Sequence, residues 1–294
     1  MAADQAVPPG AGAPPAPVCY RHTDRETYVS CVRCERPICP DCMNPASVGF
    51  QCPACVKQGA ATVRTPRTAL GGGLSGEGVV TKVLIGLNVA VFVIGVLLGV
   101  VSEGPAGGMR VLTGGLPPDF APFVMYGPSV AGGEWWRLLT AGFLHAGVLH
   151  IGLNMWALLL FGTEVERLIG RWRYLAVYVL CCIGGNIGVL LIAPNQLGVG
   201  ASGAVFGLFG ALVFFFRRLN RSPRPLISLI VLNFAIGFFI STISWQAHLG
   251  GLITGALTGA LLAYAPAGKN RTAYQIAGLV VVAAVLFGGV LLGT

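Results

Sequence analysis

Seven apolar stretches constrain this chain most, because each is close to the length that a helix needs to cross a lipid bilayer. A helix of about 20 residues crosses the hydrocarbon core of a bilayer. In this chain 54% of the residues are hydrophobic and only 10% are charged, a composition that excludes an ordinary soluble domain. We therefore predict an all-α polytopic membrane protein whose helices are embedded in the lipid bilayer. Its seven spans are expected near 79–101, 144–163, 174–193, 201–216, 225–241, 245–265 and 274–292.

The positions of the basic residues predict the orientation of these helices. A cytoplasmic N-terminus places Arg110 and Arg137 outside and the other Lys and Arg residues after residue 79 on the inner side. This is the asymmetry of the positive-inside rule. We therefore expect a multi-pass protein of the plasma membrane with a cytoplasmic N-terminus. The inner basic residues are Lys82, Arg167, Arg171, Arg173, Arg217, Arg218, Arg221, Arg224, Lys269 and Arg271.

The rest of the chain divides by composition. Residues 1–17, rich in Pro, Ala and Gly, predict a disordered tail. Residues 18–56 are rich in cysteine, and residues 57–78, which contain a run of glycines, predict a flexible linker. The membrane part then comprises a core at 79–265 and a separate seventh helix at 266–294.

Four pairs of metal-ligand residues, each with a two-residue gap, predict that residues 18–56 bind two structural zinc ions. The expected cytoplasmic location disfavours disulfides. Spacing does not fix which pairs combine, but alternating use, as in cross-braced B-box-like folds, is favoured over sequential use. The module either recruits a partner or only stabilises the chain, and its balanced charges exclude nucleic acid as an expected partner. The eight ligands are Cys19, His22, Cys31, Cys34, Cys39, Cys42, Cys52 and Cys55.

A second polar set lies in or beside the apolar stretches, where ionisable residues indicate function. The predicted orientation places Ser202, His248, His150 and Asn154 all in the outer leaflet. A serine hydroxyl needs a general base, and imidazole is suited to that role near neutral pH. We predict Ser202 as nucleophile and His248 as base. No Asp or Glu follows Glu166, so the sequence favours a Ser–His dyad without a catalytic cofactor.

Further residues are expected to support this dyad. His150 and Asn154 lie four residues apart on one helix face and suit two oxyanion donors. Phe206 lies one turn after Ser202 and could hold the imidazole by stacking, while Gly251 and Gly255 permit close helix packing. A serine in a glycine-rich helix is more often a packing residue, but the joint placement of all these groups favours catalysis.

These motifs resemble those of the rhomboid family of intramembrane serine proteases over about residues 79–265. The resemblance rests on His145-x4-His150-x3-Asn154, on Gly200-Ala201-Ser202-Gly203, on His248-x2-Gly251-x3-Gly255 and on Trp136-Arg137. It implies a six-helix core with a water-filled cavity open to the outside, and cleavage of transmembrane protein substrates near the outer membrane boundary. It also implies a structural role for His145. Many members carry tyrosine where this chain has Phe206.

Two other functions stay open at this point. A non-catalytic rhomboid-like protein would bind membrane helices for quality control or assembly, and its zinc module would recruit a cytosolic protein partner. A small-solute transporter would place polar groups at the midplane, whereas those of this chain gather toward one face.

Overall fold

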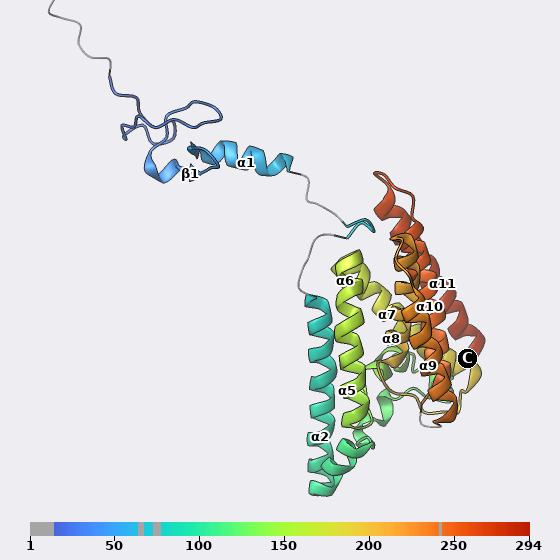
Figure 1. Cartoon of the computed structure of the whole chain (residues 1–294). Helices are drawn as coiled ribbons and strands as arrows, with labels where there is room; N and C mark the ends of the chain where they lie inside the picture. The colour runs from blue at the N-terminus through green and yellow to red at the C-terminus, as the bar shows by residue number, and fades with distance from the viewer. Residues whose placement is uncertain (1–14, 64–67, 73–77, 241–242) are drawn as a thin grey trace, which may run out of the picture. The chain divides into compact units, whose positions relative to one another are not determined.

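The computed structural model describes residues 15–63, 68–72, 78–240 and 243–294, and the chain forms two compact units, Met1–Thr65 and Pro66–Thr294 (Figure 1). Most of the expected disordered tail, residues 1–14, lies outside the described residues. So do residues 64–67 and 73–77 of the expected linker.

The first unit has few regular elements and a core made mostly of cysteine. A 3-10 turn, η1 (Pro40–Cys42), precedes two short antiparallel strands, β1 (Asn44–Pro45) and β2 (Phe50–Gln51), in which Asn44 pairs with Gln51. Helix α1 (Pro53–Thr62) follows and begins inside the expected module, but it extends into the expected linker. The buried core comprises Cys19, Cys31, Ile38, Cys39, Cys42, Cys52 and Cys55.

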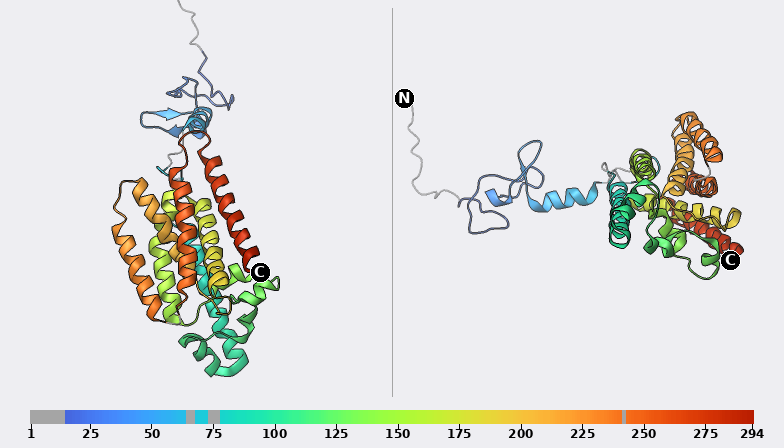
Figure 2. Two further views of the ribbon diagram at one scale, coloured as in Figure 1. Left: turned by 90° about the vertical axis from the view of Figure 1, so that its right-hand side faces the viewer. Right: turned by 90° about the horizontal axis from the view of Figure 1, so that it is seen from below.

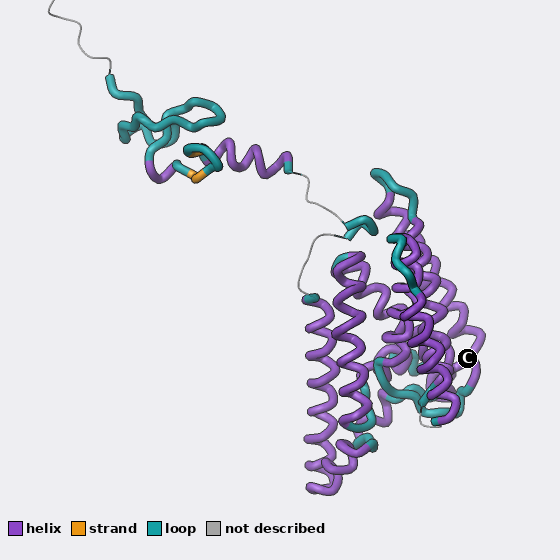
Figure 3. The backbone as a smooth tube through the Cα atoms, in the orientation of Figure 1, coloured by secondary structure: helices purple, strands orange, loops and turns teal. Residues whose placement is uncertain are grey.

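The second unit is a bundle of helices, purple in Figure 3. Outside the segment 114–147 its helices are α2 (Val79–Thr113), α5 (Val148–Ala157), α6 (Thr163–Ile169), α7 (Arg171–Ile192), α8 (Ser202–Arg218), α9 (Arg224–Phe239), α10 (Trp245–Tyr264) and α11 (Arg271–Gly293). Helices α5, α8 and α10 begin at one end of the bundle, which we call the site end; α2 and α11 begin at the opposite end, which we call the linker end (Figure 1). Helix α10 packs against α7 and α8, and α11 packs against α7 and α10 (Figure 2).

The helical architecture expected of a polytopic membrane protein is confirmed. Within the described ranges, five helical segments are long and apolar enough to cross a bilayer, and α9 is a shorter apolar helix. Helix α8, with 17 residues, is largely buried among its neighbours. The count of seven spans stays a prediction. The five segments are Val79–Thr113, Val148–Ile169, Arg171–Ile192, Trp245–Tyr264 and Arg271–Gly293.

The second apolar window was expected to end at 163, but its helix continues to Ile169. A π-helical turn, η4 (Leu158–Gly162), joins α5 to α6, which carries the fully buried Glu166. The Glu166 carboxylate accepts hydrogen bonds from the backbone N–H groups of Val80, at 3.0 Å, and Thr81, at 2.9 Å. These N–H groups lie at the start of α2, where they lack intrahelical partners and the helix dipole favours negative charge. One of the two acidic residues that follow the apolar window, Glu166, therefore caps another helix.

The segment between α2 and α5, here called the first loop, is largely helical. Helix α2 runs past its expected end at 101, breaks at Gly104, where φ is +70°, and resumes to Thr113. The loop then forms four short helices at the site end. They are η2 (Pro118–Phe123), α3 (Gly127–Ala131), α4 (Arg137–Thr140) and η3 (Ala141–Phe143).

Candidate active site and metal centres

Ser202 is the first residue of α8 and is half-buried at the site end. The chain enters the helix through Gly200, whose φ of +118° is a conformation that residues with a side chain rarely adopt. A Cβ at Gly200 would also lie 2.6 Å from Nε2 of His150. Glycine is therefore needed at this position both for the turn into α8 and for the space that the His150 ring occupies.

His248 lies in the first turn of α10 and is buried. Its imidazole stacks on the ring of Phe206 from α8, with the ring centroids 3.9 Å apart and the planes inclined by 9°. Because Phe206 is one helical turn after Ser202, the stack holds the imidazole beside the first turn of α8. Among the residues that the structure describes, Ser202 and His248 form no hydrogen bond. Catalytic hydrogen bonds are often long before substrate binds.

The contact between α8 and α10 depends on facing glycines. A Cβ on Gly251 or Gly255 would collide with the backbone carbonyl of Gly203 or Gly207 on α8. The two backbones thus touch directly, as small residues permit in membrane helices. This close approach brings the helix that carries His248 against the helix that carries Ser202.

His150 and Asn154 lie on α5, which also begins at the site end. The backbone N–H of Ala146 donates to Nδ1 of His150 at 3.4 Å. Since a backbone N–H only donates, Nδ1 is the acceptor and the neutral ring carries its proton on Nε2, which faces Gly200. The Asn154 side-chain NH2 gives one hydrogen bond to the His150 carbonyl at 2.9 Å, which leaves its second N–H free to donate elsewhere.

His145 connects these elements and is almost fully buried. Its ring lies edge-on to that of His150, with the centroids 5.1 Å apart. Its Nε2 accepts a hydrogen bond of 3.4 Å from the backbone N–H of Ala201, the residue before Ser202. The ring therefore contacts both the helix of His150 and the turn that begins α8.

Trp136 and Arg137 hold the first loop together. The Arg137 guanidinium donates to the carbonyls of Ala121, at 2.6 Å, and Val124, at 2.7 Å, and pairs with Glu134. Trp136 Nε1 donates to a third carbonyl in the same helical turn of the loop, that of Pro122, at 3.0 Å. Both side chains thus satisfy backbone carbonyls of η2 and its end, which fixes the loop at the site end.

Phe234 of α9 is a site residue that the sequence analysis did not identify. Its ring meets Phe206 edge-on, with the centroids 5.3 Å apart, and lies 6.4 Å from the ring of His248. It therefore covers the stacked pair from the side of α9. Nothing in the sequence distinguishes it from the other aromatic residues of that helix, so only the fold reveals it.

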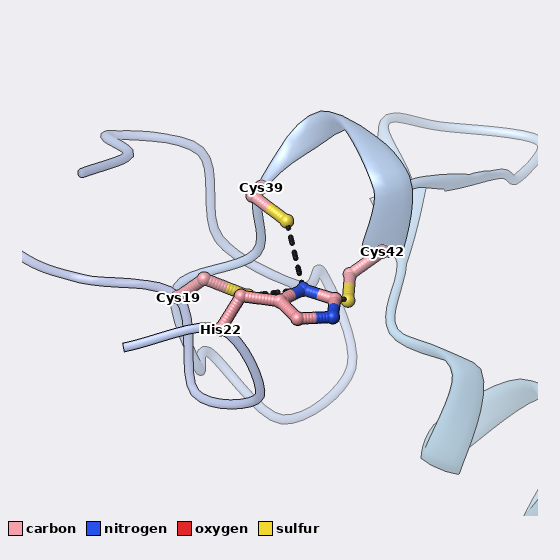
Figure 4. A group of neighbouring side chains, drawn as sticks. All are labelled: Cys19, His22, Cys39 and Cys42. Atoms are coloured by element: carbon pink, nitrogen blue, oxygen red, sulfur yellow. Dashed lines mark hydrogen bonds between the residues drawn. The ribbon is translucent and has the colours of Figure 1, made fainter. Parts of the chain in front are cut away.

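The first unit contains two groups of four metal-ligand residues, and each group combines alternate pairs. In the first, Nδ1 of His22 lies 3.2 Å from Sγ of Cys39, 3.5 Å from that of Cys42 and 4.0 Å from that of Cys19 (Figure 4). A tetrahedral zinc ion with bonds of about 2.0 Å to nitrogen and 2.3 Å to sulfur separates its ligand atoms by about 3.5 to 3.8 Å. The donor atoms and their spacing fit zinc.

The second group contains four cysteines, Cys31, Cys34, Cys52 and Cys55, whose sulfur atoms lie within 4.8 Å of one another. Cys34 and Cys52 are 3.7 Å apart, which is the edge of a zinc tetrahedron. The Arg36 guanidinium donates to Sγ of Cys34 at 3.3 Å, and this hydrogen bond lowers the pKa of the Cys34 thiol. This effect favours the thiolate form of Cys34, which is the form that binds zinc.

Comparisons with known proteins agree with these motifs. Residues 132–265 match the Rhomboid domain family. The chain is 41% identical over 138 residues to YdcA of Bacillus subtilis (strain 168), covering 45% of this chain and 69% of that protein. It is 40% identical over 147 residues to rhomboid protease GluP of the same organism, covering 47% of this chain and 28% of GluP.

A plant relative extends the comparison. RHOMBOID-like protein 6, mitochondrial, of Arabidopsis thaliana is 35% identical over 144 residues, covering 47% of each chain. The chain thus spans less than half the length of GluP and of the plant relative, but more than two thirds of YdcA. Together with the apolar helices, these matches indicate a multi-pass membrane protein. The chain belongs to the rhomboid family.

Proposed function

We propose that this chain is an intramembrane serine protease that cleaves transmembrane protein substrates in or near their membrane-spanning segments. Rhomboid proteases are serine proteases of this kind, and membership of the family supports the activity. The observation that carries the proposal for this chain is the stack of His248 on Phe206, which holds an imidazole beside the turn of α8 that bears Ser202. A nucleophile next to a base is the minimum that acyl transfer requires.

In the proposed reaction, Ser202 Oγ attacks the carbonyl carbon of the scissile peptide bond, and His248 takes the hydroxyl proton. The same imidazole then gives the proton to the leaving amine, so that a new amino terminus and an ester on Ser202 form. Water, deprotonated by His248, attacks the ester and releases the new carboxyl terminus with Ser202 regenerated. Phe206 positions the imidazole in place of the carboxylate of a triad.

The negative oxygen that forms in each step needs hydrogen-bond donors fixed in advance. We assign three donors to it. The Nε2 proton of His150 and the second amide proton of Asn154 are the side-chain donors. The backbone N–H of Ser202, at the start of α8, lacks an intrahelical partner and is the third. His145 supports this set through its contacts with His150 and with the backbone before Ser202.

We further propose a cytoplasmic N-terminus and a location in the plasma membrane. In this orientation the site end faces the extracytoplasmic side, and the first unit lies in the cytoplasm. The eight Cys and His residues of that unit then bind two structural zinc ions, which would stabilise a core whose only other buried member among the described residues is Ile38. A cytosolic protein is the proposed partner of this zinc module.

A serine-reactive fluorophosphonate probe tests the proposed nucleophile directly. The purified full-length chain should be labelled at Ser202, and Ser202→Ala should abolish labelling. Ser129→Ala, which alters another half-buried serine at the site end, is the matched control and should be labelled normally. His248→Phe keeps an aromatic ring for Phe206 to contact but removes the base, so it should also lose labelling.

Two results would count against the proposal. Labelling that survives Ser202→Ala would assign the reactive group to another residue. A folded wild-type protein that neither takes the label nor cuts any membrane substrate would instead support the non-catalytic, helix-binding function.

A further inference from the structure

Residues Thr68–Gly72, here called the strap, pack into the linker end of the second unit although they fall in the expected flexible linker. Leu70 is fully buried. Thr68 Oγ1 donates to the carbonyl of Leu168 at 2.5 Å and accepts from the N–H of Gly72 at 2.9 Å. A Cβ on Gly72 would lie 2.6 Å from the backbone of Gly170, so only glycine fits between the strap and the turn that joins α6 to α7.

A buried glutamine on α11 is the centre of this contact. The side-chain amide of Gln275 is completely inaccessible and donates to the carbonyls of Leu70, at 3.1 Å, and Leu262, at 3.0 Å. Its oxygen accepts from Arg173 Nε at 2.8 Å. A buried amide without partners costs stability, and the strap supplies one of these partners. Arg271 adds a bond of 2.8 Å to the carbonyl of Ala69.

The other end of the same helix contacts the first loop. The Phe287 ring lies edge-on to Trp135, with the centroids 5.9 Å apart. Val290 of α11 belongs to a buried cluster with Met125, Val130 and Leu138, all from the first loop. Phe287 lies about 18 Å along the helix axis from Gln275, at a rise of about 1.5 Å per residue. One rigid element thus contacts the strap at the linker end and the loop at the site end.

We propose that α11 couples the strap to the first loop, so that the position of the strap determines how firmly the loop is held. The strap fixes the linker end of α11, and α11 fixes the loop that carries Trp136 and Arg137. Because the strap continues from the first unit, a protein that binds the zinc module and withdraws the strap would loosen the loop beside the active site and lower the rate of cleavage. This regulation rests on the proposed protease function, but the mechanical coupling does not.

Hydrogen exchange of the full-length chain in lipid nanodiscs tests the coupling without any substrate. Leu70→Asp places a charge in the buried strap position and should release it. Amides of residues 68–72 should then exchange faster, and those of residues 120–137 should accelerate by about tenfold, a size typical of coupling between sites. Tyr274→Leu, an exposed neighbour of Gln275 on α11, is the matched control and should leave both segments unchanged.

Two further variants and one control decide the remaining outcomes. Gln275→Leu removes the hydrogen-bond partner of the strap and keeps α11 apolar. It is used in place of Leu70→Asp if the Leu70→Asp protein exchanges rapidly throughout α8 and α10, which would mean that it is unfolded. Phe287→Ala should increase hydrogen exchange in residues 120–137 and leave exchange in the strap slow. Leu291→Ala changes a similarly exposed residue of α11 and is the control, so it should leave exchange in residues 120–137 unchanged. A released strap with an unchanged first loop would overturn the proposal. If releasing the strap accelerates exchange in the first loop but the wild-type chain cuts no substrate, only the proposed protease function would be overturned.

Discussion

Gly255→Ala tests the direct contact between α8 and α10. Within an isolated helix, alanine is more favourable than glycine by about 1 kcal/mol, so the substitution would stabilise α10 if nothing lay opposite. In this chain the new Cβ would lie 2.5 Å from Cα of Gly207 and closer still to the Gly207 carbonyl. Ordinary contacts between carbon atoms are about 3.5 to 4.0 Å, so the two helices must separate by about 1 Å.

The expected loss follows from the two opposing effects. Overpacking costs about 1 to 3 kcal/mol, and the upper value applies because two backbones meet and neither has a flexible side chain that can move aside. After the gain of about 1 kcal/mol in helix propensity, we expect a net loss of about 2 kcal/mol. A shift of about 1 Å between Ser202 and His248 should also reduce cleavage by about 100-fold.

The measurement is the free energy of unfolding in mixed detergent micelles, together with cleavage of a membrane substrate below the unfolding midpoint. Gly288→Ala on α11 is the matched control, because a Cβ there meets nothing within 4 Å. It should stabilise the protein by up to about 1 kcal/mol and leave cleavage intact. If Gly255→Ala were as stable and active as Gly288→Ala, the glycine contact would not be what holds the two helices.

Three further predictions address the turn, the first loop and the metal. Gly200→Ala should reduce cleavage by at least about 100-fold, because its Cβ displaces the ring of His150 and its φ is positive; normal turnover would contradict that packing. Arg137→Met should lower the unfolding free energy by about 3 kcal/mol, since the buried carbonyl of Val124 and the partly buried carbonyl of Ala121 lose a charged donor; an unchanged value in denaturant titration would refute this. Metal analysis should find two zinc ions per full-length chain and one in His22→Ala. Removing the zinc with a chelator should increase hydrogen exchange in residues 18–62, and a module that stays folded without metal would refute the zinc assignment.

Much of the membrane architecture was predictable because apolar length is a local property. The prediction of helix ends was weaker. Glu166 lies just after the apolar window 144–163, yet its carboxylate lies inside the bundle against the N–H groups of Val80 and Thr81. A carboxylate that caps a distant helix looks the same in sequence as one that faces water. The helix therefore continued to Ile169 beyond its expected end.

The candidate active-site residues were identifiable because polar groups stand out against an apolar background and share one end of the bundle. The strap was not, since the partners that bury Leu70 include Gln275, which is 205 residues away. Spacing alone did not fix the ligand pairing in the zinc module, because all four pairs have the same gap, but the alternating use that was favoured is the one that the structure shows. Phe234 was missed because its contact with Phe206 arises only from the packing of α9.

Cleavage of a transmembrane reporter in proteoliposomes tests the central claim most directly. The wild-type chain should cut the reporter within or beside its membrane segment, and mass spectrometry should locate the new termini there. Ser202→Ala and His248→Phe should each abolish the products. Both variants should unfold at the same denaturant concentration as the wild-type protein, which would show that they are folded. Undiminished cleavage by either variant would contradict catalysis by a hydroxyl and an imidazole held together across α8 and α10.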